Sequence, residues 1–126
     1  MIFGIGTDIV SIDRLRSALV RHGDRFALRV LAESEHADWR ASRDPARFVA
    51  KRLAAKEAFG KALGTGVAEP ATLRALAVLH DARGKPVFAC DTRLAAHLAE
   101  QGLSAHLSLT DEQDYVVAFA VIEQAR

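Results

Sequence analysis

One long helix near the middle of the 126-residue chain constrains the fold most, because both of its ends are marked in the sequence. Asp44 is a good N-cap residue, and Pro45 suits the first helical position, where no backbone N–H is needed. Gly64 is a typical stop after the last turn. A helix from 45 to 63 would be about 28 Å long, so the rest of a small domain must fold around it. Its expected core stripe is Phe48, Ala55, Phe59, Ala62 and Leu63.

The opposite side of this helix carries an acid and a base. Glu57 and Lys61 are one turn apart and point about 40° from each other. Their neighbours on that side are small: Ala50, Ala54 and Ala58. Small neighbours predict that a second surface, either a ligand or protein, packs there. A Glu four residues before a Lys is also a common stabilising pair of exposed helices, worth about 0.2–0.5 kcal/mol, and this alternative stays open.

The first residues predict a buried strand over 2–12, rich in β-branched side chains. Alternation along a strand places Gly4, Gly6 and Asp8 on one side. The two glycines leave room for another group to approach the backbone closely. A carboxylate in an apolar strand costs free energy unless it is paired or bound to a cation. Asp8 is therefore a candidate ligand, although it could also mark the exposed end of the strand.

The remaining elements indicate a mixed fold. Helical spacing is expected at 15–22, 34–40 and 92–101, and strands at 73–80, 85–90, 105–110 and 115–123, whereas 26–33 is ambiguous. Helices and strands are interleaved irregularly and the last two strands form an antiparallel hairpin. This pattern favours the α+β class, and the length favours one domain spanning residues 1–126.

Composition excludes several classes of protein. The net charge of +1 and the aromatic content of 6% argue against a nucleic-acid-binding protein. No apolar run could span a membrane and no signal peptide is visible, while Cys90 is the only cysteine, so a cytoplasmic protein is expected. Five arginines between 14 and 29 (14, 16, 21, 25 and 29) are either a solvated helix face or a docking patch for an acidic partner.

Asp8, Glu57 and Lys61 form a chemically coherent set. Two carboxylates and a lysine are the usual protein contribution to a site that holds Mg²⁺ against phosphate oxygens. Near the C-terminus, His106, Ser108 and Thr110 alternate with leucines. Their shared strand face is either solvated or a row of hydrogen-bond donors for a phosphate or nucleotide.

Two stretches together resemble one known family, the holo-acyl-carrier-protein synthases, which are the small bacterial 4′-phosphopantetheinyl transferases. The matching residues are Gly4-Ile5-Gly6-Thr7-Asp8-Ile9-Val10 and the block from Arg47 to Gly66, with Lys56-Glu57-Ala58, Lys61-Ala62 and Gly64-Thr65-Gly66 inside it. Gly84-Lys85-Pro86 and His106-Leu107-Ser108 also fit the family. The resemblance implies a 4′-phosphopantetheinyl transferase-like fold, in which a mainly antiparallel sheet packs with a long central helix and shorter helices.

The resemblance also implies an activity. The family transfers 4′-phosphopantetheine from coenzyme A to a serine of apo-acyl carrier protein for fatty acid biosynthesis, leaving adenosine 3′,5′-bisphosphate. Asp8 and Glu57 would bind Mg²⁺, and Lys61 would neutralise phosphate charge. Arg52 and His106 would contact the phosphates of the nucleotide. Thr65 and Gly66 would contact the nucleotide through their backbone groups. Either Glu57 or a Mg²⁺-bound water could take the serine proton. At Thr110-Asp111 many relatives have Ser-His, so the resemblance assigns these two positions no role.

Two partners follow from the resemblance. Acyl carrier proteins are acidic, so Arg14, Arg21 and Arg25 would contact one. The family also implies a homotrimer with active sites shared between subunits. The stretch 115–122 is apolar on both faces of its strand, which predicts a cover on the second face: a partner subunit or a helix of the same chain. The residues alone leave two other functions open, a non-catalytic module that docks an acidic protein and a metal-dependent nucleotide hydrolase.

Overall fold

The computed structural model describes residues 1–126. The helices are α1 (Ile12–His22), α2 (Asp24–Val30), α3 (His36–Ala41), α4 (Pro45–Leu63) and α5 (Thr92–Glu100), with short 3₁₀ turns at Glu33–Glu35 and Leu73–Ala75. The strands are β1 (Ile2–Ser11), β2 (Leu76–His80), β3 (Pro86–Cys90), β4 (Leu103–Asp111) and β5 (Tyr115–Gln124). No helix of the structure combines the length and apolar character needed to cross a membrane.

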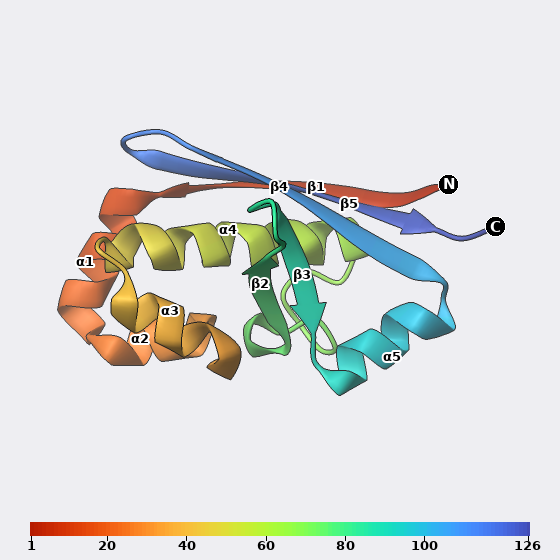
Figure 1. Ribbon diagram of the computed structural model, residues 1–126, viewed down its shortest axis with the longest axis horizontal. Helices are drawn as coiled ribbons and strands as arrows, with labels where there is room; N and C mark the ends of the chain where they lie inside the picture. Colours follow the sequence, from red (N-terminus) through yellow and green to blue (C-terminus); the bar gives the residue numbers. More distant parts are fainter.

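The central helix α4 has the bounds that its flanking residues predict. The Asp44 side chain accepts a hydrogen bond from the backbone N–H of Arg47, as an N-cap does. Gly64 ends the helix with φ 91°, and its N–H donates to the carbonyls of Gly60 and Lys61. Figure 1 shows α4 lying under a long sheet, with α1, α2 and α3 beneath one end of it and the β2–β3 hairpin and α5 toward the other.

The sheet above α4 has the strand order β1-β5-β4, with antiparallel neighbours throughout. β2 and β3 form a separate two-stranded antiparallel hairpin. The α+β class is therefore confirmed. The sheet pairs the beginning of the chain with its end, because Gly4 lies opposite Ile122 and Asp8 opposite Ala118.

Strand β1 rests directly on α4, and its glycines make this possible. A Cβ atom added at Gly4 would lie 1.9 Å from the carbonyl oxygen of Ala62, and one added at Gly6 would lie 2.1 Å from that of Ala58. No side chain fits at either position. The close approach predicted from the two glycines is confirmed, and the approaching group is the helix.

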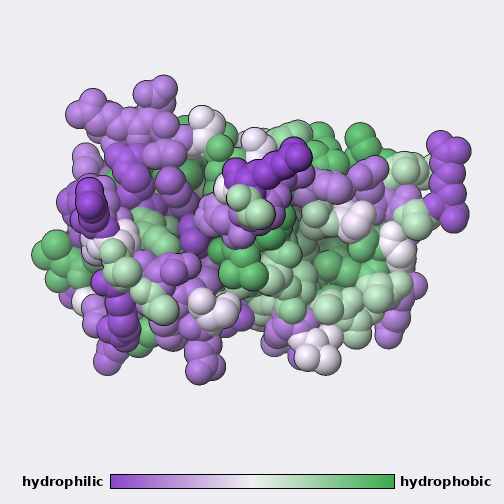
Figure 2. Space-filling view, viewed as in Figure 1, coloured by the Kyte–Doolittle hydropathy of each residue, from purple (hydrophilic) through white to green (hydrophobic).

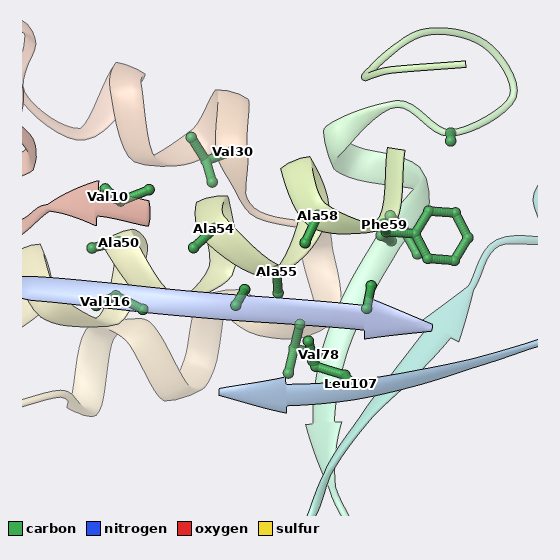
Figure 3. Close-up of a cluster of buried hydrophobic side chains, with 14 of the residues drawn as sticks. Val10, Val30, Ala50, Ala54, Ala55, Ala58, Phe59, Val78, Leu107 and Val116 are labelled. Carbon is green, nitrogen blue, oxygen red and sulfur yellow. The ribbon is translucent and has the colours of Figure 1, made fainter. Parts of the chain in front are cut away.

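The alanines of α4 complete this contact. Ala50, Ala54 and Ala58 are fully buried in the main core, together with Val10 of β1 and Val116 of β5 (Figure 3). The second surface expected at this side of the helix is therefore the chain's own sheet. Since α4 is also buried on its Phe59 side, it is a core helix covered on both sides.

One open assignment is resolved and one prediction needs correction. The ambiguous stretch 26–33 is helical as far as Val30, the end of α2, with Ala27 and Val30 buried against the core. Residues 73–75 form a 3₁₀ turn rather than the start of a strand, so β2 begins only at Leu76. In both places tertiary packing decides the conformation of a short segment that has weak local preferences.

The two faces of the sheet differ in how they are covered. On β5 the side chains facing α4 are fully buried: Val116, Ala118, Ala120 and Ile122. On the other face Phe119 is 43% exposed, and on the neighbouring β1 Ile5 and Ile9 are 59% and 63% exposed. A covering helix from the same chain, one of the two predicted alternatives, is therefore wrong.

Candidate active site

Asp8 and Lys61 meet where β1 crosses the C-terminal half of α4. The Lys61 ammonium lies 3.3 Å from Oδ1 of Asp8 and donates a hydrogen bond to the backbone carbonyl of Thr7 at 2.9 Å. The Asp8 side chain is 18% exposed, whereas that of Lys61 is 54% exposed. The strand thus supplies a largely buried carboxylate and the helix a cation that can still reach solvent.

Glu57, one turn before Lys61, joins this pair. Burial raises the pKa of the Glu57 carboxyl, the negative charge of Asp8 raises it further, and Lys61 partly opposes the rise. No hydrogen bond or ion pair of the protein engages the Glu57 carboxylate. Asp8 and Glu57 are thus close enough to repel each other, and Lys61 only partly neutralises them.

This arrangement fits a hard divalent cation. A cation between the two carboxylates would relieve the repulsion that raises the pKa of Glu57. The structure contains no cluster of three or more histidine, cysteine or acidic side chains that could hold a metal by themselves. Mg²⁺ suits a site with only two protein carboxylates, since it keeps several waters and binds substrate phosphates.

Thr65 and Gly66 lie just beyond the same end of α4. The turn folds back so closely that a Cβ atom at Gly60 would be 2.6 Å from the carbonyl carbon of Gly66. The Gly66 N–H donates to the carbonyl of Gly60 at 3.0 Å, and the Thr65 hydroxyl donates to that of Gly66 at 2.8 Å. The amide of Gly66 is therefore already used within the protein, while both residues remain exposed.

Arg52 and His106, which were also predicted to contact phosphate, lie apart from Asp8, Glu57 and Lys61. Arg52 precedes Lys61 by nine residues, which places it about 180° away around α4. His106 is on β4, at the opposite edge of the sheet from β1 and on the uncovered face, and its Nε2 is 2.6 Å from a carboxylate oxygen of Glu123. One chain therefore brings Asp8, Glu57 and Lys61 together but leaves Arg52 and His106 apart from them.

Arg52 borders a cavity of about 580 Å³. This cavity is open to solvent. It is lined by α3 and the residues after it, by the N-terminal half of α4, by the β2–β3 hairpin and by the end of β4. Its cationic lining residues are Arg43, Arg47, Lys51 and Arg52, with His80, against the three acids Asp38, Asp44 and Asp111. Phe48, Pro86 and Leu109 add apolar surface. Arg47, Lys51 and Arg52 are each paired with an acid, so Arg43 is the arginine of this lining without an ion pair.

Asp111 has a clear partner in this lining. Arg47 donates to Oδ2 of Asp111 at 2.7 Å, and the Lys51 ammonium is 3.5 Å from Oδ1. Arg47 also donates to the backbone carbonyls of Glu112 and Gln113. In this chain, position 111 therefore ties the β4–β5 turn to α4.

A buried charge cluster beside α4 was not predicted. Glu35, Arg52 and Lys56 are 1%, 5% and 0% exposed, respectively. Lys56 donates to one carboxylate oxygen of Glu35 at 2.6 Å and Arg52 to the other at 3.1 Å. Burial lowers the pKa of Lys56 and that of Arg52, and the charge of Glu35 opposes the fall in each.

The sequence alone could have indicated that Lys56 is buried. In a helix Lys56 points within about 20° of Leu63 and about 60° of Phe59, inside the apolar stripe. A charged residue on a buried face needs a buried partner. Glu35, in the polar run Glu33-Ser34-Glu35-His36, gave no such signal.

The predicted docking arginines lie together on the surface of α1 and α2. Arg14 and Arg21 line one shallow hollow on α1, and Arg25 follows on α2. All three are exposed and none forms an ion pair. Figure 2 shows hydrophilic side chains gathered over the end of the molecule that carries α1, α2 and α3. Their charges are thus free for an external partner.

Comparison with known proteins identifies the family. The family model described as the 4′-phosphopantetheinyl transferase superfamily matches residues 4–120. A holo-[acyl-carrier-protein] synthase of Azoarcus sp. (strain BH72) is 71% identical over 123 residues, which is 98% of this chain and 98% of that protein. The holo-[acyl-carrier-protein] synthase of Neisseria meningitidis has a crystal structure similar to this one, with a TM-score of 0.95 at 45% identity over 98% of this chain and 100% of that chain.

A further similar structure contains a ligand. The holo-(acyl-carrier-protein) synthase of Bacillus anthracis str. Ames was solved in complex with CoA (3′,5′-ADP). It matches with a TM-score of 0.84 at 34% identity over 99% of each chain. By fold and by sequence along nearly its whole length, the chain belongs to the 4′-phosphopantetheinyl transferase superfamily, as an enzyme of the holo-[acyl-carrier-protein] synthase type.

Proposed function

We propose that residues 1–126 act as one catalytic domain that transfers 4′-phosphopantetheine from coenzyme A to a serine of apo-acyl carrier protein. The reaction gives holo-acyl carrier protein and adenosine 3′,5′-bisphosphate, depends on Mg²⁺, and serves fatty acid biosynthesis in the cytoplasm. The observation that carries the proposal is the meeting of Asp8, Glu57 and Lys61 at the contact between β1 and α4. Family membership and the CoA-bound relative support the choice of substrates.

The transfer reaction assigns a task to each of Asp8, Glu57 and Lys61. The serine oxygen attacks the phosphorus that bears pantetheine, the bond from this phosphorus to the oxygen of the adenosine 5′-phosphate breaks, and the serine loses its proton. Asp8 and Glu57 would hold Mg²⁺, which when bound neutralises charge on the pyrophosphate and on the leaving phosphate. Lys61, half exposed, can turn from Asp8 to a phosphate oxygen. Glu57 is also a candidate to accept the serine proton.

We place the nucleotide in the cavity beside Arg52 and propose His106 as a second phosphate contact. His106 is outside the lining of this cavity, on the uncovered face of β4, so it would reach a phosphate from the other side of the sheet. This cavity and the acid pair lie on different sides of α4, which supports a site built from two chains. A homotrimer in which β1 of one subunit faces β4 of the next would complete each site. The uncovered apolar face with Ile5, Ile9 and Phe119 supports such an assembly.

Subunit mixing tests the shared site. A mixture of inactive Asp8→Ala and His106→Ala proteins should recover activity, because about a quarter of randomly formed sites would have both residues intact. A mixture of Asp8→Ala with Glu57→Ala should recover none, since these two residues act from the same chain. Light scattering should give three times the chain mass of 13.7 kDa. A particle of the single-chain mass, or recovery only in the second mixture, would contradict this arrangement.

Charge reversal tests the carrier-protein surface. Arg14→Glu and Arg21→Glu should each raise the KM for acyl carrier protein by about 3- to 10-fold and leave the KM for coenzyme A unchanged. This rise in the KM for acyl carrier protein should be smaller at high salt, because salt screens exposed charges. Arg74→Glu, at an exposed arginine of the Leu73–Ala75 turn that also forms no ion pair, is the matched control and should change neither constant. Equal effects on both substrates would assign the arginines to the nucleotide site or to the fold.

One incubation separates the three candidate functions. The protein is mixed with coenzyme A, Mg²⁺ and apo-acyl carrier protein, and the carrier is analysed by mass spectrometry. The transferase adds the mass of phosphopantetheine to the carrier. A nucleotide hydrolase would consume coenzyme A without changing the carrier, and a docking module would bind the carrier and leave both masses unchanged.

A further inference from the structure

The buried Glu35 carboxylate is held from four directions. Its Oε1 accepts hydrogen bonds from the Lys56 ammonium at 2.6 Å and from the Ala32 N–H at 2.9 Å. Its Oε2 accepts from Arg52 Nε at 3.1 Å and from the Val78 N–H at 2.9 Å. Two of these donors are backbone groups: Ala32 begins the 3₁₀ turn that carries Glu35, and Val78 belongs to β2. The carboxylate is thus held by backbone on two sides, and two side chains of α4 are attached to it.

Lys56 is attached twice and directly precedes Glu57. Besides Glu35, its ammonium donates to the backbone carbonyl of Val30 at 2.8 Å. Both bonds are directional and are excluded from water, since Lys56 is fully buried. The backbone that carries Glu57 is therefore held through the adjacent side chain.

The restraints on the other side of α4 are more exposed to water. There the contact with β1 is made by Gly4 and Gly6 against the backbone of Ala58 and Ala62. A contact between glycines and alanines sets the distance between strand and helix, and the side-chain bonds that cross it are those of Lys61 to Asp8 and to the Thr7 carbonyl. Because Lys61 is 54% exposed, water competes for these bonds, and they hold the rotation of the helix less firmly than buried bonds do. The bonds to Glu35 resist such a rotation directly.

A small rotation would matter at the acid pair. Side-chain ends lie about 6 Å from the axis of a helix, so a rotation of about 10° displaces the Glu57 carboxylate by about 1 Å. A displacement of this size is enough to reduce a catalytic rate by about 100-fold. We propose that Glu35 is a positioning residue, which acts through Lys56 and Arg52 to fix α4 at the rotation that presents Glu57 to Asp8. This inference rests on the proposed function, because it concerns the same carboxylate pair.

The substitution Lys56→Met tests this inference with little damage to the fold. The cluster contains two cations and one anion, so removing Lys56 leaves the balanced pair Glu35–Arg52 and the two backbone donors in place. Met has a similar length and no charge, and the edge-to-face contact of Phe59 with Phe88 remains. The Val30 carbonyl loses its donor, so we expect a slightly lower unfolding midpoint. We also expect a kcat lower by about 10- to 100-fold, an unchanged KM for acyl carrier protein, and Mn²⁺ affinity about 10-fold weaker by EPR.

Two further variants separate positioning from stability. Glu35→Gln should lower kcat and Mn²⁺ affinity in the same way and also lower the unfolding midpoint, because it leaves two buried cations without an anion. Leu94→Ala, at a buried position of α5, should lower the midpoint and leave kcat and Mn²⁺ affinity unchanged at a temperature where all variants are folded.

The outcomes also separate this inference from the proposed function. Wild-type kcat and Mn²⁺ affinity in Lys56→Met, or a kcat that follows the unfolding midpoint in all three variants, would overturn the role of Glu35. Transfer by the wild-type protein that needs no divalent cation would instead overturn the metal role of Asp8 and Glu57. The wild-type protein is therefore measured first.

Discussion

Replacing Asp8 or Glu57 with alanine is expected to reduce phosphopantetheine transfer by about 100-fold or more while the fold stays intact. Changes that only reorient a metal ligand already cost about 10- to 100-fold, and these substitutions would remove the ligand itself. Asp8→Ala still leaves Lys61 bonded to the carbonyl of Thr7. Glu57→Ala breaks no protein hydrogen bond and places the best helix former within α4.

The measurement compares initial rates over a Mg²⁺ titration with unfolding midpoints from circular dichroism. Glu57→Gln keeps the shape of the side chain and removes its charge, so it should behave as the alanine variant does. Glu100→Ala, an exposed carboxylate on α5, is the control and should retain the wild-type rate. Wild-type turnover by either Asp8→Ala or Glu57→Ala at limiting Mg²⁺ would remove these residues from the catalytic site.

Gly6→Ala is expected to have the largest effect on stability. The added Cβ would lie 2.1 Å from the carbonyl oxygen of Ala58, 2.8 Å from the amide nitrogen of Ala62 and 2.9 Å from the Cβ of Lys61. Backbone atoms of a buried helix cannot move aside as the end of a flexible side chain can. We expect the free energy of unfolding to fall by about 3 kcal/mol or more, at the upper end of overpacking effects.

Urea denaturation measures this loss, and Thr7→Ala provides the comparison. Thr7 is the next residue of β1 and is exposed on the other face of the sheet, so its replacement should change the free energy of unfolding by no more than about 1 kcal/mol. Equal stabilities for Gly6→Ala and Thr7→Ala would mean that strand and helix do not touch at Gly6.

The sequence predicted most where the physical signal was local. The bounds of α4 follow from Asp44, Pro45 and Gly64, each of which acts on its own turn of the helix. The glycines of β1 predicted a close contact for the same reason, since a missing side chain is visible without knowing the neighbour. Local chemistry did not reveal which surface would make that contact.

The remaining features depend on partners distant in sequence. Glu35 is indistinguishable from its exposed neighbours until α4 and β2 surround its carboxylate. The helix α2 has seven residues, too few to be stable without the core against which Ala27 and Val30 pack. The nine-residue spacing of Arg52 and Lys61 already predicts that they point to opposite sides of α4. That His106 also lies far from Lys61 follows only from the position of β4 at the other edge of the sheet.

The pairing of β1 with β5 also determines when the acid pair can form. β1 has β5 as its only strand partner, and the two are joined by more than a hundred residues, as the bond between Met1 and Gln124 illustrates. Helices can form quickly from neighbouring residues, whereas a contact across so long a loop forms late because closing the loop costs entropy. The strand that carries Asp8 is therefore expected to be docked among the last elements. During refolding, protection of the amides of α4 from hydrogen exchange should precede the appearance of the catalytic site.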